Sequence, residues 1–141
     1  MKKLITLTLL SFMAFSSSAM AKKITYLKGE FKTITPGDDV YGTGYVTKAQ
    51  NGNYYVVLGD DFETHNRAPD LRVVLHKEVR PSSYTKDNSI FLGRLKEIKG
   101  KQMYKVPANA SLKGIKSIVI YCKKFHVTFG SAKLQMVQKN I

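Results

Sequence analysis

Cys122 is the one cysteine among 141 residues, and its thiol is the first candidate for chemistry. A lone cysteine cannot close an internal disulfide, so Cys122 is a buried apolar side chain, a reactive thiol, a ligand or an intermolecular cross-link. Lys123 and Lys124 would stabilise a thiolate, and so favour redox chemistry, if their ammonium groups fold back toward the sulfur. Strand alternation places Cys122 with Ile118 and Ile120, however, in a run that is apolar on both faces. We therefore predict a largely buried thiol and keep a redox role for Cys122 as a hypothesis.

Copper is an alternative use of the same thiol. Cys122 and His126, with Met136 and either His65 or His76, supply the ligand types of a blue-copper site. Such sites usually carry the cysteine, histidine and methionine on one short loop, whereas Met136 stands well beyond His126. Copper is therefore the weaker interpretation, and we predict no cofactor while leaving haem and copper open.

Four carboxylates lie near one another in the sequence: Asp60, Asp61, Glu63 and Asp70. They would suit a calcium site or an acid/base pair if the loop folded them together, but their spacing does not match the twelve-position calcium loop. We expect Asp70, which follows Pro69 at the start of a strand, to accept backbone N–H bonds in an Asx turn. Because the sequence has no Ser-His-Asp signature, Gly-rich phosphate cradle or paired-cysteine motif, we lean against an enzyme.

A basic run alternates with apolar residues around Gly100, and its cationic members are Arg94, Lys96, Lys99, Lys101 and Lys105. We interpret this run as one charged face of a hairpin with Gly100 at the turn, able to bind an anionic polymer in a salt-sensitive way. Tyr104 would add a stacking surface for a sugar ring. The simpler alternative is a solvated sheet face without a binding role.

The elements that position these residues should be β-strands, because alternation with period two dominates and no segment carries the stripe of a convincing helix. The clearest signal is a hairpin within 42–58, where two β-rich runs flank Asn51-Gly52, a pair suited to a tight turn. In a strand over 125–129, His126 should face solvent while Phe125 packs inward. Short strands with turn signals at close spacing predict a single antiparallel β-sandwich or barrel. Further strands are expected at 24–32, 71–76, 90–95, 102–106, 116–121 and 134–137.

The N-terminus predicts export. Lys2 and Lys3, an apolar stretch over 4–15 and small residues up to Ala21 form a secretory signal, so 1–21 should be removed and 22–141 should form one domain. The apolar stretch is shorter than the ~20 residues that span a bilayer, so we expect no stable membrane span. We expect a periplasmic protein, with secretion as the alternative.

The charge balance favours anionic partners. Removal of two lysines with the signal leaves 21 basic residues against 10 acidic ones, a formal net charge of +11. Such a surface attracts polyanions, but export argues against nucleic acid. We therefore expect a separate acidic redox protein or an anionic envelope polymer as the partner.

Three stretches, taken together, resemble the DM-thirteen domain family over about residues 28–134. Two departures are mild: Ala68 stands where the family commonly has glycine, and Tyr121 stands where tryptophan commonly precedes the cysteine. The positions that carry the resemblance are Pro69, Asp70 and Leu71 in the first stretch, Gly93 in the second, and Tyr121, Cys122 and Phe125 in the third.

The resemblance implies an exported β domain with an accessory role in electron transfer, in which Cys122 occupies the position of the proposed redox cysteine. Members of the family accompany haem-binding DOMON domains in cuticle proteins of the Knickkopf and Skeletor type, so we expect the partner of this chain to be a separate protein. The competing interpretation from the residues themselves is a non-catalytic binding module for an anionic glycan, lipid or envelope polymer.

Overall fold

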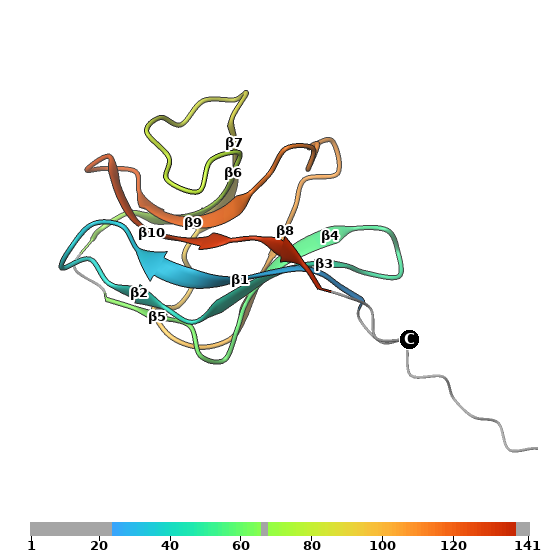
Figure 1. Ribbon diagram of the computed structural model, residues 1–141, viewed down its shortest axis with the longest axis horizontal. Coiled ribbons are helices and arrows are strands. Elements are labelled where there is room, and N and C mark those ends of the chain that lie inside the picture. Colours follow the sequence, from blue (N-terminus) through green and yellow to red (C-terminus); the bar gives the residue numbers. More distant parts are fainter. Residues whose placement is uncertain (1–23, 66–67, 138–141) are drawn as a thin grey trace, which may run out of the picture.

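The computed structural model describes residues 24–65 and 68–137, which contain strands and no helix (Figure 1). The expected all-β class is confirmed, whereas the predicted signal over 1–21 lies outside the described residues. The strands are β1 (Ile24–Thr33), β2 (Val40–Tyr41), β3 (Thr43–Lys48), β4 (Tyr54–Leu58), β5 (Glu63–Thr64), β6 (Leu71–His76), β7 (Ser89–Arg94), β8 (Gln102–Lys105), β9 (Ser117–Cys122), β10 (Val127–Lys133) and β11 (Gln135–Met136).

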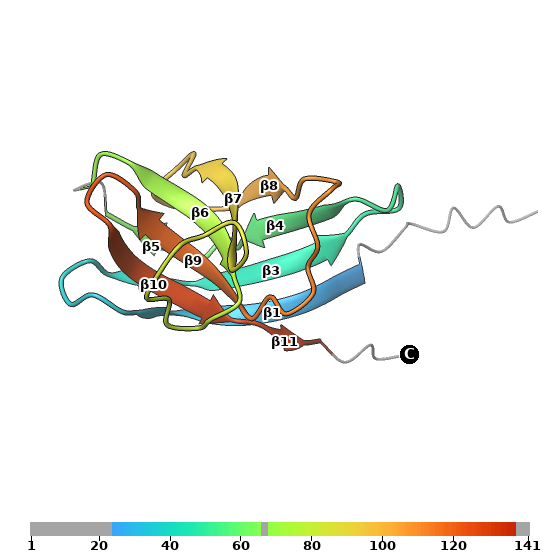
Figure 2. The same cartoon turned by 90° about the horizontal axis from the view of Figure 1, so that it is seen from above.

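Nine of these strands form one antiparallel sheet in the order β7-β6-β9-β10-β1-β3-β4-β8, with β11 added beside β1. The two end strands, β7 and β8, approach each other, so the sheet curls into a nearly closed barrel (Figure 2). The two-residue strands β2 and β5 pair separately. Within the described ranges, no helix is long and apolar enough to cross a membrane.

The core lies inside this curled sheet. Phe62, Leu58, Leu75, Ile118 and Ile120 are fully buried there, as alternation along β9 predicts for the two isoleucines. A smaller apolar cluster lies on the outer face of the sheet, where Val74, Val119 and Tyr121 are buried against the partly buried Tyr84. All six residues of β9 are therefore buried, which confirms a central strand covered on both sides.

The hairpin within 42–58 is confirmed, since β3 and β4 pair from Gly44 opposite Leu58 to Lys48 opposite Tyr54. The connection is longer than a two-residue turn. Gly52 adopts a φ of 85°, and its N–H donates to the carbonyl of Ala49 at 3.0 Å. Glycine adopts this left-handed conformation without a steric penalty, whereas Asn51 does not have a positive φ, so only the glycine of the expected Asn51-Gly52 tight turn is confirmed.

Two expectations were wrong. The strand expected from Phe125 begins at Val127, because residues 123–126 form the turn between β9 and β10, and the Phe125 side chain is 59% exposed rather than packed inward. The hairpin expected around Gly100 does not form, since β7 pairs with β6 and β8 pairs with β4. The intervening segment instead lies beside β5, where Lys99 forms an isolated bridge with Glu63 and the Gly100 N–H donates to the carbonyl of Phe62 at 2.9 Å.

Candidate functional site

Cys122 lies at the end of β9 with its backbone between Leu71 of β6 and Val127 of β10. Its side chain is 0% exposed and belongs to the inner core, which confirms the predicted burial. Among the described residues, no three His, Cys, Asp or Glu side chains gather into a metal-binding group. Met136, a ligand in the copper interpretation, is 75% exposed on β11 beside Leu27.

The residue before Cys122 points to the opposite face of the sheet and builds an aromatic cluster. The ring of Tyr121 stacks on that of Tyr84, with centroids 3.8 Å apart and planes 20° apart. Phe91 meets both tyrosines edge to face at 6.1 Å, and His76 meets Tyr84 edge to face at 5.1 Å. Four aromatic side chains from four segments therefore meet outside the barrel, separated from the thiol by the sheet itself.

Tyr121 is hydrogen-bonded to a histidine across the turn. Its hydroxyl lies 3.0 Å from Nδ1 of His126. His126 is exposed, as predicted, and its φ of 54° is the one positive φ among described residues other than glycine. Histidine is one of the residues that tolerate this conformation, so the turn directs an imidazole back onto the Tyr121 hydroxyl. Burial, followed by the charge of Cys122 when it is deprotonated, raises the pKa of Tyr121, so the phenol keeps its proton at neutral pH.

An open cleft of about 420 Å³ lies over this cluster. Its walls combine the aromatic rings with two groups that can carry positive charge, an ammonium and an imidazole. The lining residues are Pro81, Ser82, Ser83, Tyr84, Phe91, Tyr121, Lys123, His126 and Thr128.

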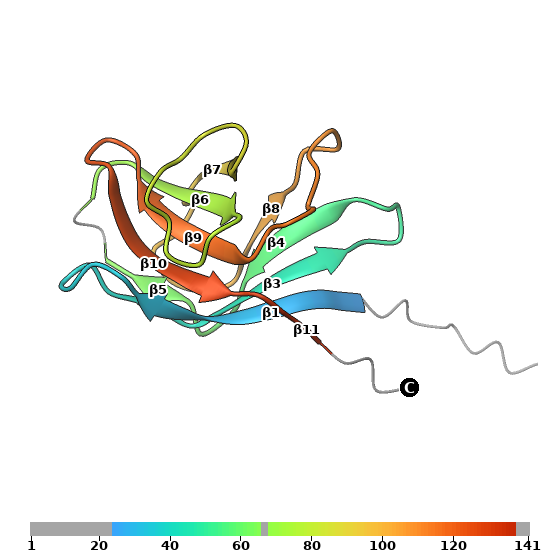
Figure 3. The ribbon, with the colours of Figure 1, turned by 45° about the horizontal axis from the view of Figure 1, so that its top comes forward.

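Tyr84 reaches the cluster because residues 77–88 fold over the outer face of β6, β9 and β10 (Figure 3). His76 holds this segment at one end: Nε2–H donates to the carbonyl of Ser83 at 2.8 Å, and Nδ1 accepts from the N–H of Glu78 at 2.9 Å. Two buried serines hold it elsewhere, since Ser117 donates to the carbonyl of Glu78 and Ser131 to that of Val79. The sequence does contain polar side chains within these strands, at positions that alternation assigns to a face of the sheet. Spacing alone, however, does not show that residues 77–88 are the segment that covers them.

Tyr84 should make the protein less stable in alkali. Burial raises the pKa of Tyr84 to about 12 from its ordinary value of 10.0, against the opposing effect of its hydrogen bond with Thr128. The neutral phenol is therefore favoured in the folded state, and its contribution to stability is complete below pH 10 and lost as the pH rises toward 12. Denaturant midpoints measured across this range should fall less steeply for Tyr84→Phe than for the native protein.

Tyr41→Phe is the matched control for that experiment, because the Tyr41 ring is 57% exposed. It should leave the alkaline slope unchanged. Equal slopes for the native protein and Tyr84→Phe would contradict the assignment, although part of the slope will persist because burial also raises the pKa of Tyr104 and Tyr121.

The positions of the family resemblance lie together in space. Pro69 and Asp70 lead into β6, which starts at Leu71, Gly93 lies at the irregularity of β7 with a φ of 129°, and Tyr121 is the last residue but one of β9, so the three stretches occupy adjacent strands. Leu71 is buried and Pro69 is exposed. The strand order thus brings these positions to one part of the sheet.

Asp70 joins the first stretch to the third. Its carbonyl accepts from the N–H of Lys123 at 3.0 Å, beside the thiol-bearing end of β9. Its carboxylate accepts from Nε of Arg72 at 2.8 Å, and that hydrogen bond is the main reason why the pKa of Asp70 is lowered. The expected Asx turn is thus replaced by an ion pair.

The other carboxylates also act locally. Asp61 accepts from the N–H of Thr43 at 2.9 Å and from its hydroxyl at 2.8 Å, and the hydroxyl bond is the main reason why the pKa of Asp61 is lowered. Asp60 and Glu63 are exposed. Asp61 therefore closes the loop between β4 and β5 against β3.

The basic run is exposed at all five cationic positions: Arg94, Lys96, Lys99, Lys101 and Lys105. Tyr104 does not supply the expected stacking surface, because its ring is 3% exposed and its hydroxyl donates to Gln102 while accepting from the N–H of Lys96. The ammonium of Lys96 lies 4.8 Å from the centroid of that ring and donates to the carbonyl of Met103. Binding of an anionic polymer to the remaining lysines stays a prediction.

Comparison with known proteins places the chain in a family. Residues 30–134 match the sequence model of a family described as Electron transfer DM13, close to the range of the resemblance noted above. Neither the curated proteins nor the solved structures include a match to the chain. The matched region contains the aromatic cluster, Cys122 and strands β2 to β10 complete. The chain belongs to the Electron transfer DM13 family.

Proposed function

We propose that this protein is an exported accessory domain for one-electron transfer, in which Tyr121 is the redox residue and a separate redox protein docks over the aromatic cleft. The observation that carries the proposal is the 3.0 Å contact between the Tyr121 hydroxyl and Nδ1 of His126 beneath that cleft. The family description supports the same general chemistry. The periplasmic location in this proposal rests on the sequence of residues 1–21.

Tyr121 replaces Cys122 in this role because the thiol has no access to a reaction partner. Thiol–disulfide exchange begins with attack by an exposed thiolate, and the Cys122 side chain is 0% exposed. The sequence also holds no second cysteine that could accept a disulfide within the chain. In the proposal Cys122 packs the inner core, and the electron leaves from the neighbouring residue on the outer face.

The chemistry couples an electron to a proton. In this proposal His126 carries its proton on Nε2 and the phenol of Tyr121 donates to Nδ1, so on oxidation the O–H bond breaks and an Nδ1–H bond forms. The electron passes through the stacked ring of Tyr84 to a strongly oxidising one-electron centre of the partner, such as a ferryl haem, which is reduced by one electron. A one-electron donor, such as a ferrous haem protein, then reduces the tyrosyl radical while the proton returns from His126.

Tyr121 is better placed than Tyr84 for this reaction. Tyr84 bonds to the hydroxyl of Thr128 at 2.6 Å, and a hydroxyl is a poor proton acceptor, whereas an imidazole is a good one. Tyr121 is also 5% exposed, which shields the radical from solvent. The more exposed rings of Tyr84 and Phe91 provide the contact with the surface.

The surface beside the cleft suits an acidic redox partner. The turn that carries His126 also presents Lys123, Lys124 and the Phe125 ring, which is 59% exposed, and the Phe91 ring nearby is 38% exposed. Lysines around exposed apolar groups steer an acidic protein into a small, short-lived contact of the kind that redox partners use. In this proposal the exposed Phe125 ring, which was expected to pack inward, forms part of the surface that contacts the partner.

The proposal is tested by flash oxidation of the purified protein with a photogenerated ruthenium(III) tris-bipyridine complex, while tyrosyl radical is followed by absorbance and electron paramagnetic resonance. Tyr121 should form radical in a fast phase near neutral pH. Removing its proton acceptor in His126→Asn, a residue that also tolerates a positive φ, should slow that phase by about 10²-fold. Tyr121→Phe should abolish it.

Tyr84→Phe is the matched control, since it keeps the stacked ring and removes the hydroxyl that bonds to Thr128. It should keep the fast phase. A fast phase that survives Tyr121→Phe would assign the radical to one of the other tyrosines and overturn the proposal, and an unchanged rate in His126→Asn would remove the histidine from the mechanism.

A further inference from the structure

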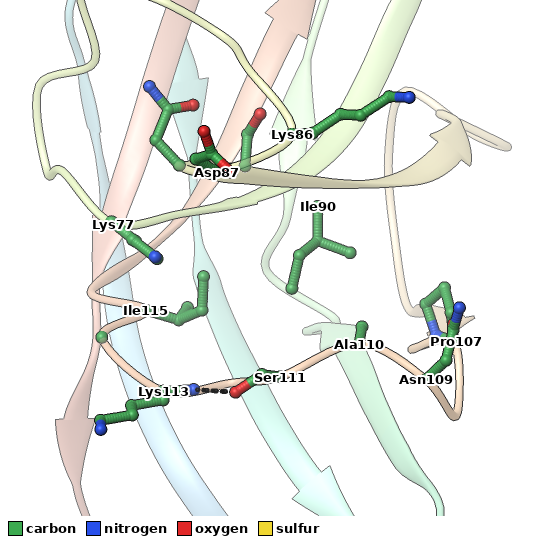
Figure 4. Close-up of a pocket in the computed structure, with 13 residues that line it drawn as sticks. Lys77, Lys86, Asp87, Ile90, Pro107, Asn109, Ala110, Ser111, Lys113 and Ile115 are labelled. Atoms are coloured by element: carbon green, nitrogen blue, oxygen red, sulfur yellow. Dashed lines mark hydrogen bonds between the residues drawn. The ribbon is translucent and has the colours of Figure 1, made fainter.

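A second hollow lies at the end of the barrel, away from the aromatic cleft and sharing no residue with it (Figure 4). It has a volume of about 740 Å³, within the range of roughly 300–1,000 Å³ that small-molecule sites occupy. One wall is the start of β7 with the preceding turn, and the other is the connection between β8 and β9.

The lining of this hollow is mixed, and its apolar part is formed by three side chains, Ile90, Ala110 and Ile115. Ile90 on one wall faces Ala110 and Ile115 on the other across the gap in Figure 4. All three are partly buried and pack against the inner core, so the floor of the hollow is the outermost layer of that core. The hydrogen bonds described for residues 107–115 are local to that segment, including Ala110 N–H to Pro107 and Ile115 N–H to Leu112. The hydrogen bonds of residues 107–115 therefore do not join the two walls to each other. An apolar group can enter between the walls.

The rim carries an excess of positive charge. Lys77, Lys86 and Lys113 come from three separate segments, and Asp87 is the one carboxylate among the residues that line the hollow. No carboxylate oxygen of a described residue lies within 4.0 Å of these three ammonium groups. In Figure 4 the Lys77 amine points into the gap, whereas Lys86 and Lys113 extend away from it.

Lys77 lies beside the opposite wall. A Cβ added to Gly114 would lie 3.8 Å from Cδ and Cε of Lys77, an ordinary contact distance, so the exposed lysine stem runs past the glycine backbone. Gly114 has a φ of 79°, which L side chains rarely adopt, so the turn itself favours glycine. The Lys77 cation is therefore placed beside the three apolar side chains of the hollow.

We propose that this hollow binds a single-chain anionic lipid, with the acyl chain between Ile90 and Ile115 and the headgroup at Lys77. Charge complementarity selects the anion, and the apolar gap selects the chain. No aromatic ring stands among the described residues that line the hollow, so it lacks the stacking surface typical of a sugar site. This site is independent of electron transfer at Tyr121.

The test is calorimetric titration of the purified protein with dodecanoate below its micellar concentration. Saturable binding at one site is expected. Acetate, which has the headgroup without the chain, and dodecyl maltoside, which has the chain without the charge, should each bind at least about tenfold more weakly. Added salt should weaken dodecanoate binding because the rim charges are exposed.

Two single variants that remove equal charge separate a site from general attraction. Lys77→Gln should weaken dodecanoate binding about tenfold or more, whereas Lys101→Gln, in the basic run, should leave it unchanged. Absence of dodecanoate binding, equal losses in both variants, or equally tight binding of dodecyl maltoside would each overturn the proposal. Because none of these outcomes involves tyrosine oxidation, failure here is distinguishable from failure of the electron-transfer proposal.

Discussion

In the folded protein, Cys122 should react with a soluble aromatic disulfide reagent about a thousandfold more slowly than in the unfolded chain, or slower still. The side chain is 0% exposed, between neighbouring strands, and its sulfur lies within the inner core. A group buried in core strands reacts through opening reactions that cost up to the whole free energy of unfolding, about 5 kcal/mol or more for a typical domain. The measurement is the thiol release rate with and without denaturant.

Ser82→Cys provides the control for that measurement, because Ser82 is exposed on the segment that covers the outer face. The added thiol should react rapidly in native buffer while Cys122 stays protected. If Cys122 reacted at a comparable rate without denaturant, the thiol would have a route to solvent, and a direct redox role for Cys122 would regain its place over Tyr121.

Replacing Phe62 with alanine should lower the free energy of unfolding by about 3–5 kcal/mol, the usual cost of removing a buried phenylalanine ring. Phe62 is 0% exposed, and its ring packs edge to face on Phe31 with centroids 5.5 Å apart and planes 65° apart. Its backbone carbonyl also accepts from the N–H of Gly100, so Phe62 helps to hold the segment between β7 and β8 beside β5. The loss is read from denaturant unfolding curves.

Phe125→Ala makes the same chemical change at a ring that is 59% exposed. It should alter stability by about 0.5 kcal/mol or less. Similar losses for the two variants would show that Phe125 is packed as the sequence first predicted, and that the turn over 123–126 is misplaced.

The bounds of the central strands could be predicted closely, because a strand that is covered on both faces must be apolar along its length and the sequence shows that apolar run. β6 begins and ends at the expected residues, 71 and 76, since Pro69 sets its start and continuous apolar character marks burial on both faces. The burial of Cys122 followed from alternation with Ile118 and Ile120, for the same reason. β2 and β5 were not predicted, because a strand of two residues is too short to show an alternating pattern.

The candidate site was harder to predict because it depends on contacts between distant segments. The stack of Tyr121 on Tyr84 joins residues whose separation in the sequence gives no indication of contact. Alternation started the second strand at Phe125, but the reversal between β9 and β10 needs a longer turn, and 123–126 supply it with His126 in the left-handed conformation. The Tyr121–His126 contact exists because of that turn, so the same local error hid both features.

The pairing of β1 with β10 also has a consequence for the order in which the molecule can assemble. The middle of the sheet joins Phe31 to Ala132, nearly the whole length of the domain apart. A chain that emerges from the N-terminus first cannot complete this pairing until its last strands are free, and such distant contacts form slowly. The sheet order therefore makes closure of the sheet a late step of folding, after the local pairs of β3 with β4 and of β9 with β10 can form.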